Sequence, residues 1–91
     1  MQQQNRNNFG NTKMAKTRTE QQMVNAIQKN AKRLIEASEK SLAILAEDAG
    51  IPLMTYWGIV SRPGRKSTPS HYNLSRVAAS LGVSVDELID G

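Results

Sequence analysis

Few side chains in this sequence have the types and spacing that catalysis needs. There is no cysteine, which excludes thiol nucleophiles, disulfides and thiolate metal sites. His71 is the single histidine and no acidic residue adjoins it, so neither a metal site nor a Ser-His-Asp triad is indicated. There is also no glycine-rich loop of the kind that cradles phosphates. We therefore expect a protein that is not an enzyme and that has no cofactor.

Basic side chains indicate a different chemistry, the binding of a polyanion. The net charge of +4 resides in residues 1–19, where Arg6, Lys13, Lys16 and Arg18 have no acidic counterpart. This segment has too little apolar surface to offset the entropy of ordering it, so we expect a disordered basic tail. Such a tail suits nucleic acid or an anionic surface, with Lys16 and Arg18 nearest the folded part. A solvated end that meets no partner is the alternative.

Helical periodicity runs through residues 20–91, which we expect to form one all-α domain of five helices. Apolar residues recur at three- and four-residue steps, without strand-like alternation. The first three helices are predicted at about 20–38, 42–49 and 52–61. A fourth helix is capped by Ser70 or Asn73 and ended by Gly82, and a short fifth helix follows it.

Residues at the expected helix ends support these boundaries. Ser41 can accept a hydrogen bond from a free amide of the following turn, and Gly50 suits the left-handed residue that ends a helix. Pro52 fits a first helical turn, and Ser84 with Glu87 has the spacing of a capping box. The apolar positions predict a core of Ile27, Leu34, Leu42, Leu45, Ala46, Ile51, Ile59, Leu74, Val77, Leu81, Val83 and Leu88.

The second and third helices are joined by a tight turn, Gly50-Ile51-Pro52, which is typical of a helix-turn-helix over Ser41–Ser61. Small Ala46 faces the helix crossing, and Tyr56 packs inward. In this motif the outward face of the second helix enters the major groove of DNA, with its N-terminal residues nearest the base edges. That outward face is predicted to comprise Leu53, Met54, Trp57, Gly58 and Ser61.

Residues 30–90 resemble the lambda-repressor-like family, which includes phage repressors, Cro proteins and many bacterial regulators. The matching strings are SLAILAEDAGIP from Ser41, the aliphatic pair around Ile59, and LSRVAASLGVSVDEL from Leu74. The resemblance implies the five-helix fold of that family, the binding of double-stranded DNA and the role of a repressor. Together with the motif, it places DNA contacts at Ser41, Pro52, Leu53, Met54, Thr55, Trp57, Gly58, Ser61, Arg62, Arg65 and Lys66.

The sequence departs from the family's pattern in the presumed recognition helix. Leu53, Met54 and Trp57 are apolar where family members usually carry polar side chains that read bases. Apolar groups contact thymine methyls, but they cannot make the bidentate pairings that discriminate bases best. Gly58 either lets the DNA backbone approach closely or only weakens the helix. We expect no oligomerisation domain after Gly91, and the expected protein is then Cro-sized, an antitoxin-sized regulator or a piece of a longer repressor.

Several residues have two interpretations. One interpretation of the basic loop is phosphate binding by Arg62, Arg65 and Lys66, and the other is a solvated loop. We favour phosphate binding because these residues follow the recognition helix directly. Trp57 contacts DNA or completes the core, and His71 contacts a phosphate or is a plain surface or capping residue. The cations of the first helix contact DNA or, as we favour, form ion pairs with its acids; they are Lys29, Lys32 and Arg33 with Lys40, beside Glu36 and Glu39.

The sequence therefore predicts a sequence-specific DNA-binding regulator of phage or bacterial type, located in the cytoplasm. Double-stranded DNA is the expected partner, with a homodimer on DNA as one arrangement. No apolar run approaches the roughly 20 residues that span a bilayer, and no small-molecule ligand is indicated. The alternative is a protein-interaction module on the same fold, antitoxin-like or an adaptor, which uses Leu53, Met54 and Trp57 as an exposed apolar patch.

Overall fold

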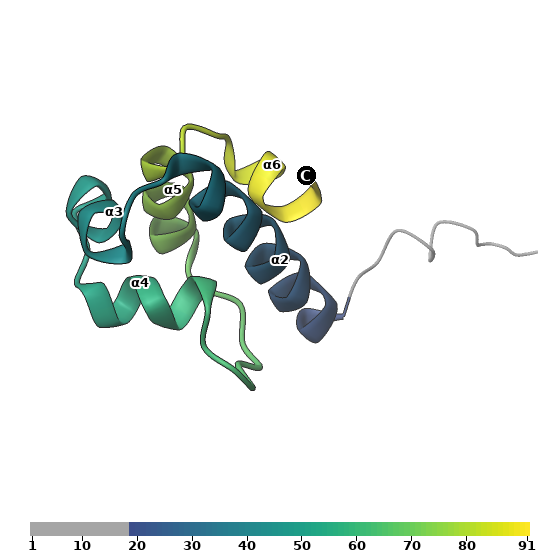
Figure 1. The fold of residues 1–91 in the computed structure, drawn as a ribbon. Helices are drawn as coiled ribbons and strands as arrows, with labels where there is room; N and C mark the ends of the chain where they lie inside the picture. Colours follow the sequence, from purple (N-terminus) through teal and green to yellow (C-terminus); the bar gives the residue numbers. More distant parts are fainter. Residues whose placement is uncertain (1–18) are drawn as a thin grey trace, which may run out of the picture.

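The computed structural model describes residues 19–91, and these residues form five helices and no strand. The helices are α2 (Glu20–Ser38), α3 (Leu42–Ala49), α4 (Leu53–Val60), α5 (His71–Ser80) and α6 (Val85–Asp90) (Figure 1). The prediction of an all-helical domain is confirmed. The expected bounds of α2 and α3 match those observed, and α4 is one residue shorter at each end because Pro52 and Ser61 are its caps.

Hydrogen bonds at the helix ends explain these boundaries. Ser41 and Ser70 accept hydrogen bonds from the backbone N–H of Ile44 and Asn73, so Ser70 rather than Asn73 caps α5. The capping box predicted at Ser84 is present. A second capping box, which sequence reasoning missed, begins α2. The Thr19 hydroxyl accepts a hydrogen bond from the backbone N–H of Gln22, and the Gln22 side chain accepts one from the backbone N–H of Thr19. Each such cap is worth about 1 kcal/mol to its helix.

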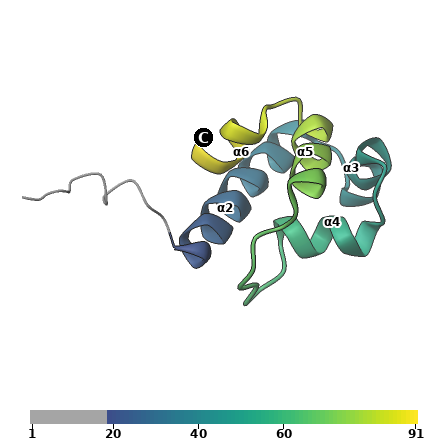
Figure 2. The ribbon, with the colours of Figure 1, turned by 180° about the vertical axis from the view of Figure 1, so that it is seen from behind.

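The helices pack around one core. α2 contacts α6 and α4, α3 contacts α5 and α4, and α5 contacts α6. Figure 2 shows the same arrangement from behind, with α4 beneath α3 and the loop after α4 beside α2. Of the predicted core, Ile27, Leu45, Ala46, Ile59, Leu74, Val77 and Leu88 are buried, and Leu34, Leu42, Ile51, Leu81 and Val83 are partly buried against them. Val24, Ala31, Ala49, Tyr56, Val60 and Ala78 are also buried.

Tyr56 is the largest fully buried side chain, and it ties α4 to α5. Its hydroxyl lies 2.7 Å from Ser80 Oγ, and Ser80 Oγ in turn donates to the carbonyl of Val77 at 2.7 Å. Because the serine hydrogen is used in that second bond, the tyrosine is the donor in the first. The prediction that Tyr56 packs inward is confirmed.

None of the helices formed by residues 19–91 is long and apolar enough to cross a membrane. The same part of the chain contains no group of three or more His, Asp or Glu side chains that could hold a metal ion.

Candidate nucleic-acid interface

The turn between α3 and α4 has the geometry that the sequence predicts. Gly50 adopts a φ of +73°, and its N–H donates to the last carbonyls of α3, those of Ala46 and Glu47. The N–H of Ile51 also reaches Ala46, with a distance of 3.2 Å. A left-handed residue at this point reverses the chain within a few residues. The two short helices therefore meet at a tight glycine turn.

Arg76 on α5 holds the end of α3, and sequence reasoning missed this contact. Its Nε donates to the carbonyl of Ala49 at 2.6 Å, and its guanidinium lies 5.9 Å from the centre of the Tyr72 ring. A cation at a helix C-terminus is favourable because the free carbonyls there carry partial negative charge. The positive φ favours glycine at this position, and a Cβ at Gly50 would in addition shift the end of the flexible Arg76 side chain.

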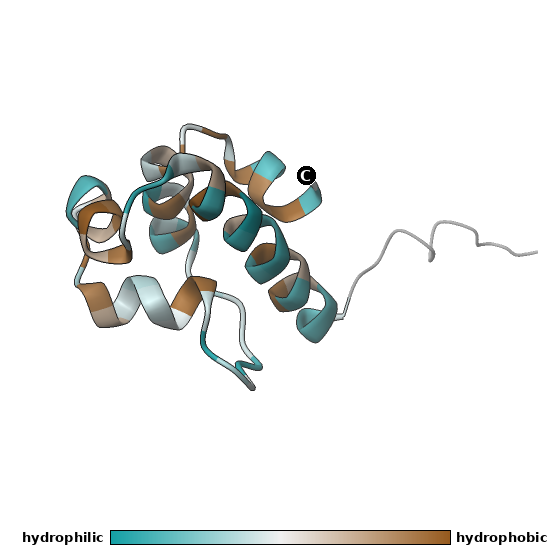
Figure 3. Ribbon diagram, viewed as in Figure 1, coloured by the Kyte–Doolittle hydropathy of each residue, from teal (hydrophilic) through white to brown (hydrophobic). Residues whose placement is uncertain are grey.

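The N-terminal end of α4 presents apolar side chains to solvent, as predicted. Met54 is 72% exposed and Leu53 is 45% exposed. With Trp57 they form one side of an open groove of about 300 Å³, and Leu42 and Ala43 from the start of α3 form the other. We call this the α3–α4 groove. Figure 3 shows the hydrophobic colouring of the start of α4. Trp57 is half-buried and lines the groove.

The prediction for Gly58 is wrong. This glycine was expected on the outward face of α4, but it is buried. Arg65 covers it: the Nη1 atom of Arg65 donates to the Gly58 carbonyl at 2.7 Å, and a Cβ at Gly58 would lie 3.7 Å from the same atom. A DNA backbone therefore cannot approach α4 closely at this glycine without displacing the arginine.

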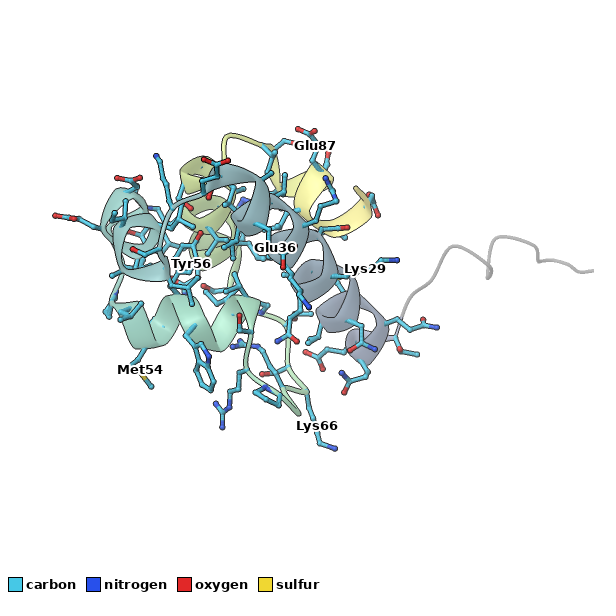
Figure 4. The ribbon with its side chains drawn as sticks, viewed as in Figure 1. Lys29, Glu36, Met54, Tyr56, Lys66 and Glu87 are labelled. Atoms are coloured by element: carbon cyan, nitrogen blue, oxygen red, sulfur yellow. The ribbon has the colours of Figure 1, made fainter. Side chains whose placement is uncertain are left out.

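The three predicted loop cations differ in their surroundings. Arg65 is half-buried and donates to two carbonyls of its own chain, those of Gly58 and Ser67, so its role is to hold the loop against α4. Arg62 and Lys66 are exposed, and no side-chain hydrogen bond or ion pair involves them within residues 19–91. In Figure 4, Lys66 projects below the ribbon, as Met54 does from α4. Two of the three cations thus remain available to a polyanion.

Polar side chains of α2 hold the backbone of the loop, and sequence reasoning missed them. The Nε2 atoms of Gln21 and Gln28 donate to the carbonyls of Arg65 and Arg62 at 3.2 and 3.1 Å. Glu20 accepts from the backbone N–H and hydroxyl of Thr68. Gln21 and Gln28 are seven residues apart and share one face of α2. That spacing indicates a polar face on α2, but it does not identify the loop as the partner of that face.

The remaining predicted site residues lie at the surface with separate roles. Ser41, Pro52 and Ser61 are exposed, Thr55 is half-buried, and Ser41 Oγ is occupied as the cap of α3. His71 is exposed at the first position of α5. The tail residues Lys16 and Arg18 lie outside the described residues.

The ion pairs expected for α2 are absent from the described part of the chain. Neither Glu36 nor Glu39 pairs with a cation, and Lys40 pairs instead with Asp48 on α3, at 3.3 Å. Lys29 and Lys32 line a second hollow of about 450 Å³ with Gln28, Val60 and Ser61. No acidic side chain lines this hollow.

Comparison of the chain with protein-family models, with curated proteins and with solved structures gives no match.

Proposed function

We propose that this protein binds double-stranded DNA, with α4 in the major groove and the loop after it on the phosphate backbone. One observation carries the proposal: the exposed N-terminal turn of α4 and two exposed cations, Arg62 and Lys66, lie on consecutive elements. The loop that bears these cations is held in place by α2. An α-helix with its side chains is about 10–12 Å in diameter, and the major groove is about 12 Å wide. A helix of this size fits into the groove with its first turns on the bases.

Charge and rigidity support this assignment. Cations held beside a recognition helix supply affinity and register by contacting phosphates, while the helix supplies specificity. Arg65 and the three polar side chains of α2 fix the loop backbone, so Arg62 and Lys66 lose less conformational freedom on binding than they would on an untethered loop. The resemblance to phage repressors extends the proposal to a transcriptional regulator, in particular a repressor of phage or bacterial type.

Selection of duplexes from a random-sequence library by the full chain tests this proposal. We expect enrichment of a defined sequence, and competition by unlabelled duplex of that sequence but not of a scrambled one. The Arg62→Ala/Lys66→Ala variant should enrich the same sequence with lower affinity, because phosphate contacts carry little sequence information. Recovery of no enriched sequence by the folded wild-type chain would overturn the proposal.

A second candidate function rests on the α3–α4 groove itself. Five apolar residues around an open hollow of about 300 Å³ also suit an apolar side chain of a partner protein. The two functions differ in their response to salt, because DNA binding weakens steeply as salt rises whereas an apolar contact does not. We favour DNA because the exposed cations lie on the element that directly follows α4.

A further inference from the structure

We infer that the α3–α4 groove binds the C5-methyl group of thymine, so that this protein discriminates bases by apolar contact and not by bidentate hydrogen bonds. The inference rests on the proposed binding of duplex DNA and assigns the chemical group that the groove recognises. Leu53, Met54 and Trp57 face this group from α4, and Leu42 and Ala43 face it from α3.

The polar groups near the groove are too few for the usual base readout. The helix α4 carries only two side chains with polar atoms at its accessible surface, Thr55 and Trp57, and both are half-buried. Neither offers the paired donors or the donor–acceptor pair that reads guanine or adenine bidentately. Arg65, a long cation on the loop beside α4, is bound to the carbonyls of Gly58 and Ser67. Arg65 is therefore not available to read guanine, and α4 itself carries no arginine.

Thymine presents the one apolar group at the floor of the major groove, its C5-methyl. An apolar hollow gains free energy by removing that methyl from water, and it gains nothing from the polar edge of cytosine. The exposure of Met54 and Leu53, at 72% and 45%, leaves both side chains able to reach a base. The flexible Met54 side chain can adjust its shape to a small apolar group.

Charge argues for DNA as the occupant of the groove. Arg62 and Lys66 follow α4 on an exposed loop, and within residues 19–91 no acidic side chain pairs with either of them. A second copy of the chain would bring the same positive charges face to face. The five residues that line the groove also fall short of the roughly 1,000 Å² that a stable protein interface buries. A phosphate backbone bordering a thymine methyl matches both the charge and the apolar surface.

The inference can be tested by replacing thymine with uracil, which lacks only the C5-methyl. The duplex that the full chain selects is synthesised with thymine or with uracil throughout, and both are titrated with wild type. We expect uracil to weaken binding by about fourfold for each methyl group that the groove contacts, from the free energy of burying one methyl. A third duplex, with 5-methylcytosine in place of cytosine, separates thymine from the other source of a C5-methyl.

Two variants assign the effect to the groove. Met54→Gln should bring the affinities for the thymine and uracil duplexes close together, because the methyl then meets an amide. Lys66→Gln is the matched control: it should lower affinity for both duplexes by the same factor and leave their ratio as in wild type. Met54 and Lys66 are both exposed, so both variants are expected to melt at the wild-type temperature.

The outcomes are distinct. Equal wild-type affinity for the thymine and uracil duplexes would overturn the inference while leaving the proposed function intact. The same holds if Met54→Gln does not change the ratio of the affinities for the two duplexes. A preference for 5-methylcytosine without a thymine effect, or a change in the oligomeric state of free Met54→Gln, would also overturn it. Absence of binding to any duplex would instead remove the proposed function on which it rests.

Discussion

The Nη1 atom of Arg65 lies 2.7 Å from the carbonyl oxygen of Gly58, and this bond joins the loop after α4 to the last turn of α4 itself. Gly58 is buried, so the arginine satisfies an acceptor that water does not reach freely. The same side chain holds Ser67 through its Nε atom. A cation that sequence reasoning assigned to phosphate binding thus organises the surface on which the other two cations lie.

Removal of this arginine should destabilise the protein more than removal of its neighbours. Arg65→Ala leaves the Gly58 carbonyl without its donor, and we expect a loss of about 1–3 kcal/mol in the free energy of unfolding. Arg62→Ala and Lys66→Ala change exposed side chains and should stay within about 0.5 kcal/mol of wild type. Urea denaturation of the three variants measures the difference. Equal stability of all three would mean that the hydrogen bonds of Arg65 contribute nothing.

Gly58→Ala should stabilise the protein. The added Cβ would lie 3.7 Å from Arg65 Nη1, an ordinary van der Waals distance, so no neighbour has to move. Alanine gains about 1 kcal/mol over glycine in a helix interior. Thermal melting should therefore show a higher midpoint than wild type. A lower midpoint would mean that α4 needs the space at this position, in contrast to the arrangement described above.

The turn at Gly50 permits a comparison with a matched glycine. Gly50 and Gly82 have nearly the same φ, +73° and +74°, but a Cβ at Gly50 meets the Arg76 guanidinium whereas a Cβ at Gly82 meets nothing within 4 Å. Both substitutions to alanine incur the left-handed penalty of roughly 1–2 kcal/mol. We expect Gly50→Ala to destabilise further, because it displaces Arg76 from Ala49.

The Arg76→Ala background provides the check on this comparison. There the two glycine substitutions should cost nearly the same, because the guanidinium is gone. Urea denaturation of Arg76→Ala, of the two single glycine variants and of the two double variants completes the comparison. An excess cost at Gly50 that persists without Arg76 would show that the arginine is not its cause.

The pH dependence of stability should carry a signature of Tyr56. Burial raises the pKa of the Tyr56 phenol above its ordinary value of 10.0, the hydrogen bond with Ser80 lowers it, and the charge of Asp48 raises it. The unfolded chain releases this proton near pH 10, whereas the folded chain keeps it to higher pH. The folded state therefore binds more protons in that interval, and the free energy of unfolding falls as pH rises above about 10.

A residue at this position that cannot ionise removes this effect. Tyr56→Phe should cost about 1 kcal/mol at neutral pH through the lost hydrogen bond, and its deficit relative to wild type should shrink above pH 10. Tyr72→Phe removes a tyrosine that is exposed and outside the core, and it is the matched control. A constant difference between wild type and Tyr56→Phe across the alkaline range would contradict this account.

Sequence reasoning located the helices well because the signals at their ends are local. Ser41 bonds an amide three residues on, and Ser84 and Glu87 bond each other across the same spacing. Gly50 follows α3 directly. Such hydrogen bonds depend only on the residues of one turn, so their types and spacing can predict them, although the same spacing at Thr19 and Gln22 was missed.

The arrangement of the candidate site was less accessible from the sequence. Arg65 has the type and position of a phosphate clamp, and only the packing of the loop shows that it bonds Gly58. Arg76 reaches Ala49 across 27 residues, and Gln21 reaches Arg65 across 44. Long side chains at the surface choose among several partners once the fold brings them together. A single sequence contains no signal for that choice.

Titration of a labelled mixed-sequence duplex with the full chain, over a series of salt concentrations, tests the central claim most directly. We expect the logarithm of the association constant to fall linearly with the logarithm of salt concentration. The slope of this line should become less steep by about 0.9 in Arg62→Ala and in Lys66→Ala for each phosphate that the variant no longer neutralises. Arg33→Ala, which removes a cation that donates to the carbonyl of Gly91 at the end of α6, should keep the wild-type slope. Binding that is independent of salt, or slopes unchanged in both loop variants, would contradict an interface built on α4 and its loop.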